Sequence, residues 1–175
     1  QGGRHSGCGI GGGGGQQLVD NYLEGLESAG PSGLGPRVHS LVVCGPEMGS
    51  ADKLRIRARH AHRRDVSIID FTSDLVTTMA ASDVVVSMGG YNTICEVLSL
   101  AKPAVIMPRR HPRLEQWIRC TRMAELGLLR VVHPEQDPAS NLMREVRAAL
   151  DAPPRQPSSL NLSGLSTLDQ LLPGF

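Results

Sequence analysis

The residues best placed to do chemistry lie in one short segment, residues 87–96, with the sequence SMGGYNTICE. Its two glycines follow an apolar run and let the backbone approach a ligand closely. The amide groups of the helix that follows can hold a diphosphate without a metal, and Asn92 or Thr93 can cap that helix. Glu96 lies one turn further along, where its carboxylate suits two hydrogen bonds from a vicinal diol such as that of ribose. A tight turn with a capping residue and a solvated glutamate is the alternative interpretation.

The elements that must position this segment alternate between strand and helix. The expected strands are residues 38–44, 66–69, 83–87, 104–107 and 129–132. The expected helices are residues 16–28, 51–61, 74–81, 92–100, 114–126 and 139–150. This alternation predicts an α/β fold, with a Rossmann-like, doubly wound and mostly parallel sheet that has helices on both faces.

Ligands of such sheets bind beyond the carboxyl ends of the strands, where helix N-termini point their free N–H groups. Four segments fall at this edge: the glycine run near the start of the chain and residues 70–72, 89–93 and 108–116. Their convergence is the main argument for a site. The last of them carries basic side chains that either counter phosphate charge or face solvent, namely Arg109, Arg110, His111 and Arg113.

The composition changes along the chain and divides it into three parts. Residues 1–15 are dominated by glycine, so a flexible segment is expected there. Residues 16–152 carry the alternating elements and are expected to form the binding domain. Residues 153–175 begin as a Pro/Ser-rich linker and end in a short expected helix, marked by Leu165, Leu168, Leu171 and Leu172.

Composition and spacing exclude several classes of function. The net charge is +1, from 18 basic and 17 acidic residues, and aromatic residues make up 3%, so no nucleic-acid partner is expected. The scattered cysteines predict no metal site, and His60 and His62 are expected on different faces of a solvated helix end. Residues 9–14 match G-x-G-x-x-G, as any run of glycines does, but no strand pattern precedes them, which disfavours dinucleotide binding.

Several motifs, taken in order, resemble those of a known family. They are Gly90-Tyr91-Asn92-Thr93 with Glu96, then Lys102-Pro103, Met107-Pro108 and Glu115-Gln116. They resemble the nucleotide-sugar-binding signature of GT-B glycosyltransferases, above all the C-terminal domain of the family 28 type and a group of bacterial predicted glycosyltransferases. The resemblance runs from about residue 11 to residue 150. It implies the Rossmann-like C-terminal half of a GT-B fold, which binds a UDP-sugar beside an N-terminal half that binds the acceptor.

The resemblance also implies roles for individual residues. The diphosphate would be held at the strand–helix turn by Gly89, Gly90, Tyr91, Asn92 and Thr93. Glu96 would hold the ribose, and Phe71 would contact the base. Glu115 and Gln116 would form hydrogen bonds with the hydroxyl groups of the sugar.

Two departures from the family pattern concern the phosphates. Met88 stands where related plant-type enzymes place a phosphate-binding histidine, and the glycine loop does not follow a strongly hydrophobic strand. The resemblance still implies phosphate contacts from Gly13 and Gly14 in that loop. The basic loop adds Arg109 and His111 as candidate phosphate contacts.

These observations predict the donor-binding domain of a metal-independent, inverting glycosyltransferase. The acceptor hydroxyl would displace UDP in line, and helix N–H groups would stabilise the leaving diphosphate, which fits a sequence without a D-x-D carboxylate pair. No cofactor is expected besides the UDP-sugar donor. The general base and the acceptor pocket are expected in an N-terminal half or a separate subunit. Two alternatives stay open: a UDP-sugar hydrolase or epimerase, and a non-catalytic nucleotide-sugar-binding subunit of a two-chain transferase.

A cytoplasmic location is expected, because neither a secretory signal nor a transmembrane segment is visible in the sequence. The scattered cysteines favour buried thiols in a reducing compartment. Peripheral contact with the inner face of a membrane, through the N-terminal half, is left open.

Overall fold

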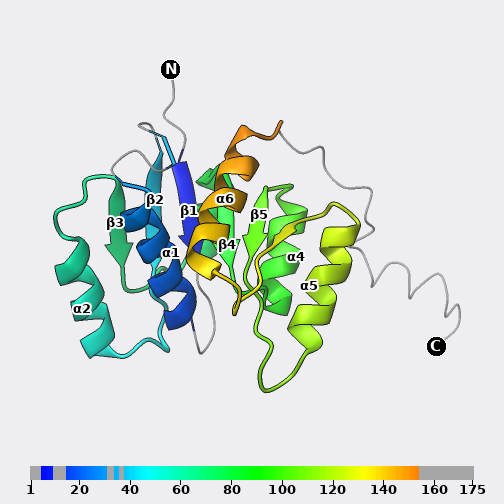
Figure 1. Ribbon diagram of the computed structural model, residues 1–175, viewed down its shortest axis with the longest axis horizontal. Coiled ribbons are helices and arrows are strands. Elements are labelled where there is room, and N and C mark those ends of the chain that lie inside the picture. The colour runs from blue at the N-terminus through cyan, green and yellow to red at the C-terminus, as the bar shows by residue number, and fades with distance from the viewer. Residues whose placement is uncertain (1–4, 10–14, 31–33, 36–37, 154–175) are drawn as a thin grey trace, which may run out of the picture.

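The chain folds around one six-stranded sheet in the computed structural model (Figure 1). The structure describes residues 15–30, 34–35 and 38–153, together with the backbone of residues 5–9. In chain order the elements are β1 (His5–Gly9), α1 (Gln16–Ser28), β2 (His39–Val43), α2 (Ser50–His60), β3 (Val66–Ile69), α3 (Leu75–Ala81), β4 (Val84–Ser87), α4 (Tyr91–Ser99), β5 (Ala104–Ile106), α5 (Glu115–Glu125), β6 (Arg130–Val131) and α6 (Pro138–Asp151). All strand pairs are parallel, in the order β3-β2-β1-β4-β5-β6, so the predicted α/β fold is confirmed.

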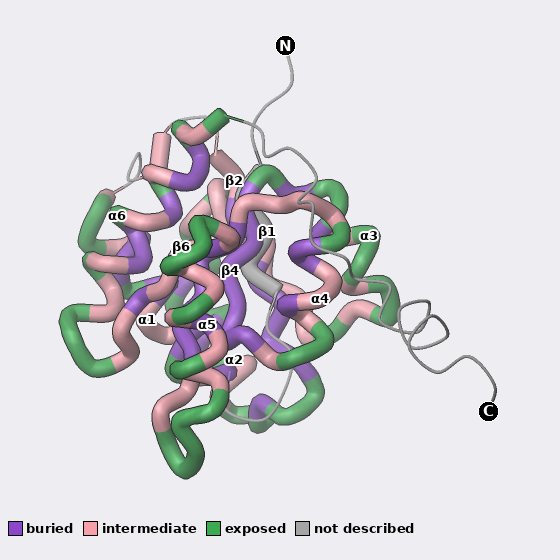
Figure 2. Tube along the Cα trace, turned by 90° about the vertical axis from the view of Figure 1, so that its right-hand side faces the viewer, coloured by how far each residue is buried: buried purple, intermediate pink, exposed green. Residues whose placement is uncertain are grey.

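Helices cover both faces of this sheet. Because successive strand residues point to opposite faces, Val84 and Val86 pack in one core cluster and Val85 packs in the other. The first cluster joins the sheet to α1, α2 and α6, and the second joins it to α3, α4 and α5. Figure 2 shows the buried residues along the strands and the inner faces of the helices, with exposed residues at the periphery.

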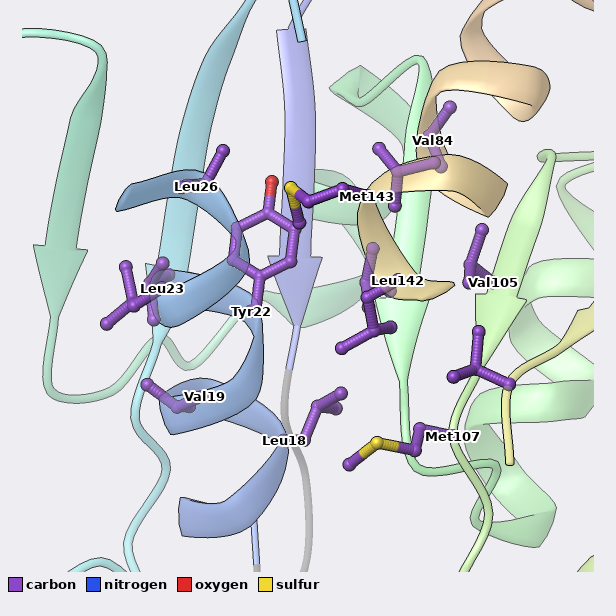
Figure 3. Close-up of a cluster of buried hydrophobic side chains, with 14 of the residues drawn as sticks. Leu18, Val19, Tyr22, Leu23, Leu26, Val84, Val105, Met107, Leu142 and Met143 are labelled. Carbon is purple, nitrogen blue, oxygen red and sulfur yellow. The ribbon is translucent and has the colours of Figure 1, made fainter. Parts of the chain in front are cut away.

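The helix α1 is held at the centre of the first face. Its apolar residues Leu18, Tyr22 and Leu26 recur at helical spacing and are buried, and Figure 3 shows Leu18 and Tyr22 on the side of α1 that faces Leu142 and Met143 of α6. The two helices cross so closely that a Cβ atom at Gly25 would lie 2.7 Å from the carbonyl oxygen of Ala139. This packing fixes the N-terminus of α1 at the carboxyl edge of the sheet.

A flexible segment was expected over residues 1–15, but residues 5–9 of it form the strand β1. Residues 5–9 pair with β2 on one side and with β4 on the other, so they form a central strand. Their sequence, HSGCG, has little β-propensity, and hydrophobic patterning therefore does not reveal it. Main-chain hydrogen bonds from two neighbouring strands give this segment its conformation. Residues 1–4 and 10–14 lie outside the described residues, as does nearly all of the linker and helix expected over 153–175.

The topology determines where a ligand can bind. The chain moves outward from β1 to β3, then crosses back through α3 to β4 on the other side of β1. The direction of winding therefore reverses between β1 and β4, and ligands of open α/β sheets bind outside the carboxyl ends of the strands at such a point. The β4–α4 turn, which carries the best sequence motif, lies at this position. Within the described residues, no helix is long and apolar enough to cross a membrane.

Candidate functional site

The β4–α4 turn is packed tightly against its neighbours. Gly89 has a φ of +75°, in the left-handed region that favours glycine. A Cβ atom at this position would lie 2.7 Å from both Cys120 Sγ and Ile106 Cγ2. Conformation and packing together therefore require glycine at this turn.

The N-terminus of α4, directly after this turn, is open. Gly90 is the N-cap residue, with φ −56° and ψ 151°, and no side chain of the described chain caps the helix. The first hydrogen bond within the helix runs from the Ile94 amide to the Gly90 carbonyl at 3.0 Å, so the amides of residues 91–93 have no acceptor within the helix. Free amides and the helix dipole make this end suitable for an anion. The prediction that Asn92 or Thr93 caps α4 is wrong, because both residues lie inside the helix.

Glu96 lies on α4 one turn beyond the open end. It follows Asn92 by four residues and Thr93 by three, so the three side chains share one face of the helix. Glu96 and Thr93 are half-buried, while Tyr91 and Asn92 are exposed. The structure thus brings the expected diphosphate residues and the expected ribose residue together at one helix end.

A recess of about 270 Å³ opens beside this end of the sheet. It lies between the start of α1, the ends of β4 and β5, and the β6–α6 loop, and is lined by Gln17, Leu18, Met88, Met107, Pro108, Arg109, Arg110, His111, Pro134 and Glu135. The structure therefore places two of the expected phosphate contacts, Arg109 and His111, in the wall of the recess. The other two, Gly13 and Gly14, lie outside the described residues.

The start of α5 carries the two residues expected at the sugar, and their contacts differ. The Gln116 Oε1 atom accepts a hydrogen bond from the Arg109 amide at 3.4 Å, on the side of the recess. Glu115 is exposed, and its Oε1 atom lies 2.9 Å from Arg119 Nη1. Gln116 is therefore held beside the recess, while Glu115 is held by an arginine of its own helix.

Phe71 follows β3 at the same edge of the sheet, and 62% of its surface is exposed. Two strands, β2 and β1, lie between β3 and β4. The loop that begins at Phe71 leads into α3, which packs against β1, so the chain turns back toward the middle of the sheet. An exposed aromatic ring at this edge suits stacking on a planar base.

A network around Arg110 was missed by sequence reasoning. Arg110 Nη1 lies 2.9 Å from Glu135 Oε2 and 3.1 Å from His133 Nε2, and its guanidinium lies 5.5 Å from the centre of the Trp117 ring. Trp117 is half-buried and packs edge-on against His133. The network joins the β5–α5 loop to the β6–α6 loop, and residues so far apart in sequence gave no signal of it.

Two buried thiols, those of Cys44 and Cys120, are poor candidates for nucleophiles. Burial raises the pKa of Cys120 to about 11. Burial is also the main cause that raises the pKa of Cys44, at the end of β2. Both thiols therefore stay protonated near neutral pH. Among the described residues, no group of three or more His, Cys, Asp or Glu side chains is placed to hold a metal ion.

A solvated helix end was expected at His60 and His62, but His60 is buried. Its side chain is only 3% exposed, and Nδ1 lies 3.4 Å from Glu27 Oε1. Burial lowers the pKa of His60 despite this carboxylate. His62 is exposed, as expected. His60 is the last residue of α2 and His62 follows it, at the opposite edge of the sheet from the β4–α4 turn.

Comparison with known proteins gives a family match over most of the chain. A model of the glycosyltransferase family 28 C-terminal domain matches residues 11–157. A curated protein of Mannheimia succiniciproducens is 28% identical over a match that covers 71% of this chain and 42% of that protein. Its name is UDP-N-acetylglucosamine--N-acetylmuramyl-(pentapeptide) pyrophosphoryl-undecaprenol N-acetylglucosamine transferase. The chain thus spans less than half the length of this relative.

Solved structures share the fold. The structure of MurG from Acinetobacter baumannii matches with a TM-score of 0.72 at 16% identity, over 98% of this chain and 50% of that one. UDP-GlcNAc 2-epimerase from Neisseria meningitidis, bound to UDP-GlcNAc, matches with a TM-score of 0.57 at 13% identity, over 88% of this chain and 40% of that one. At these identities the likeness concerns the fold alone.

Proposed function

Because the chain belongs to the glycosyltransferase family 28 C-terminal domain family, we propose that it is the donor-binding domain of a glycosyltransferase that uses a UDP-sugar. The observation that carries the proposal is the open N-terminus of α4 behind the Gly89 turn, with Glu96 one turn inside. Such an end holds a diphosphate through its amides. The Glu96 carboxylate accepts hydrogen bonds from the two ribose hydroxyls.

The remaining site residues lie around the open end of α4 and contact the other parts of the donor in this proposal. Phe71 contacts the uracil ring, and the recess beside Gln116 receives the sugar attached to the distal phosphate. Arg109 and His111 line that recess, and the Arg109 guanidinium places positive charge near the phosphates. This arrangement orders base, ribose, diphosphate and sugar along the carboxyl edge of the sheet.

The proposed reaction is an inverting transfer without a metal ion. The acceptor hydroxyl oxygen forms a bond to the anomeric carbon as the bond from that carbon to the diphosphate oxygen breaks. The pair of electrons leaves with UDP, and the amides of α4 stabilise the charge that develops there. The acceptor proton passes to a base outside this domain, in an N-terminal half or a partner subunit. The domain alone is therefore expected to bind the donor and to turn over little.

Titration with UDP in the presence of EDTA tests the proposal. UDP at about 100 times its dissociation constant should stabilise the fold by about 2.7 kcal/mol. Glu96→Ala should weaken UDP binding by about 1.5–3 kcal/mol, because a charged hydrogen bond is lost. The effect of this substitution should shrink with 2′-deoxy-UDP, which lacks one of the two hydroxyls. Calorimetric dissociation constants measure the loss of UDP affinity in Glu96→Ala and its reduction with 2′-deoxy-UDP.

Glu24→Ala is the matched control, because Glu24 is an exposed glutamate on α1, and it should leave UDP affinity unchanged. Stabilisation by NAD without any by UDP or UDP-sugars would contradict the proposal. Equal UDP affinities for the wild type and Glu96→Ala would show that Glu96 is only a solvated helix residue.

Gln116→Ala separates sugar recognition from nucleotide binding. It should leave the affinity for UDP nearly unchanged and weaken the binding of UDP-GlcNAc by about 1–3 kcal/mol. The reason is that the Gln116 amide can donate hydrogen bonds to sugar hydroxyls and accept hydrogen bonds from them. Gln136→Ala, in an exposed loop, should change neither affinity. If Gln116→Ala weakened both ligands by the same factor, the role of Gln116 would be structural.

A second proposal is a UDP-sugar hydrolase or epimerase, and the fold match to UDP-GlcNAc 2-epimerase favours keeping it. Incubation of the chain with UDP-GlcNAc in water distinguishes the two. Release of UDP or formation of an epimer, without an acceptor or a second chain, would support this alternative. Activity only after mixing with an acceptor-binding chain would instead identify a subunit of a two-chain transferase.

A further inference from the structure

We infer that Arg119, on the second turn of α5, is a positioning residue that holds the β4–α4 turn in its diphosphate-binding conformation. The inference rests on the proposed function. Arg119 lies outside every motif that the sequence singled out. It follows Glu115 by four residues and directly precedes Cys120, whose sulfur packs against Gly89.

Three contacts fix the guanidinium group of Arg119. Nη2 donates a hydrogen bond to the Gly89 carbonyl oxygen at 3.3 Å, and Nη1 donates to Glu115 Oε1 at 2.9 Å. The guanidinium carbon lies 5.7 Å from the centre of the Tyr91 ring. Only 20% of the side chain is exposed. One side chain of α5 thus contacts both residues that flank Gly90, at the open end of α4.

The contact with the Gly89 carbonyl determines where the next amide points. In a trans peptide the C=O and N–H bonds point in opposite directions. With the carbonyl oxygen held by Arg119, the Gly90 N–H points away from that guanidinium. The peptide joins two glycines, whose backbone is unusually free, so without Arg119 it can rotate. Rotation would turn a carbonyl oxygen toward the anion that the helix end is proposed to bind.

Arg119 also neutralises Glu115. This carboxylate contacts the same guanidinium that contacts the Gly89 carbonyl, so it lies close to the turn. An unpaired negative charge there would repel a diphosphate. Arg119 therefore supports phosphate binding in two ways: it orients the Gly90 peptide, and it cancels a nearby like charge.

Arginine has the geometry that this task requires. Its planar fork presents two Nη donors to two acceptors at once, whereas the single ammonium group of lysine is a compact point charge. Arg119→Lys should therefore keep the charge but lose part of the positioning, and its UDP affinity should fall between that of the wild type and that of Arg119→Ala.

The test measures UDP affinity of the full chain by calorimetry, with the thermal unfolding midpoint of every variant. Arg119→Ala should bind UDP at least tenfold more weakly. Adding Glu115→Ala to this variant should then recover affinity at least threefold, because the unpaired carboxylate is gone. A residue that merely docks α5 would show no such recovery. If Arg119→Ala does not fold, the neutral substitution Arg119→Gln with and without Glu115→Ala carries the same comparison.

Arg122→Ala is the matched control. Arg122 lies on the same helix, is 77% exposed, and pairs with Glu125 at 3.3 Å. UDP affinity of Arg119→Ala within twofold of this control would overturn the inference. So would a double variant that binds UDP no more tightly than Arg119→Ala. Failure of the wild type to bind either UDP or UDP-GlcNAc would instead reject the proposed function itself.

Discussion

The helices α3 and α4 both begin at the carboxyl edge of the sheet, but their first turns differ. Asp74 caps α3, and its Oδ1 atom accepts a hydrogen bond from the Thr77 amide at 2.9 Å. The Asp74 amide in turn donates to the Thr72 hydroxyl at 3.1 Å. α4 has Gly90 at the same position and no capping side chain in the described chain.

This difference separates a helix end that serves stability from one that can serve binding. At α3 the cap satisfies an amide and places a carboxylate where an anion would have to sit, so a phosphate is excluded. At α4 the amides are left for a ligand and the N-cap carries no charge. The N-terminus of α4 lacks the stabilisation that a capping side chain gives. Its conformation depends instead on contacts with β5 and α5.

The largest expected effect comes from breaking the turn that shapes the α4 end. Gly89→Ala should destabilise the fold by about 3 kcal/mol or more, because left-handed strain adds to overpacking against Cys120 and Ile106. Urea unfolding measures the loss. Gly127→Ala is the matched control, since Gly127 also has a positive φ, of +69°, but nothing lies within 4 Å of its Cβ position. Equal losses in the two variants would show that packing at Gly89 is unimportant.

A second substitution gives α4 the cap that α3 already has. The backbone at Gly90 suits a capping residue, and the nearest atom to its Cβ position is Thr93 Oγ1 at 3.9 Å. Gly90→Asp should raise the free energy of unfolding by a few tenths of a kcal/mol and weaken UDP binding by at least about tenfold, or about 1.4 kcal/mol. Gly90→Asn, a cap without charge, should weaken binding less. Unchanged UDP affinity in Gly90→Asp would place the diphosphate elsewhere.

The smallest expected effect comes from removing the cap of α3. Asp74→Ala should lower the unfolding midpoint by a few degrees, about what one lost cap causes, and leave UDP affinity unchanged. Hydrogen bonding from the Thr77 side chain and amide holds the pKa of Asp74 below its ordinary value of 3.8. The stabilising contribution is therefore complete above that ordinary value and disappears as the pH falls through the lower folded-state pKa.

Melting curves of the wild type and Asp74→Ala at pH 7 and near pH 3 measure this dependence. The two midpoints should differ at pH 7 and converge on acidification. Asp74→Asn checks the cause, since a neutral amide oxygen can still cap the helix but does not titrate. A difference that grew toward acid pH would contradict this account of the α3 cap.

Most elements of the fold could be predicted because the spacing of apolar residues within a segment shows which of its faces is buried. The run VSII over residues 66–69 predicted β3 with its observed bounds, and the spacing of Leu18, Tyr22 and Leu26 predicted the buried face of α1. The segment around Gly89 and Gly90 was also identifiable, because two glycines after a buried strand form a local signal. Such patterns need no knowledge of distant residues.

The sequence by itself therefore determined the alternation of strands and helices, the sheet edge and the motif residues that gather there. Only the tertiary structure decided that residues 5–9 form a strand, because β2 and β4 supply the partners for their main chain. It also decided that Gly90 rather than Asn92 or Thr93 occupies the N-cap, since that depends on how β4 and α5 hold the turn. Arg119 meets a carbonyl oxygen 30 residues away, and Arg110 meets Glu135 across 25 residues. Long side chains find such partners only after the chain has folded, because contacts between distant residues leave no periodicity in the sequence.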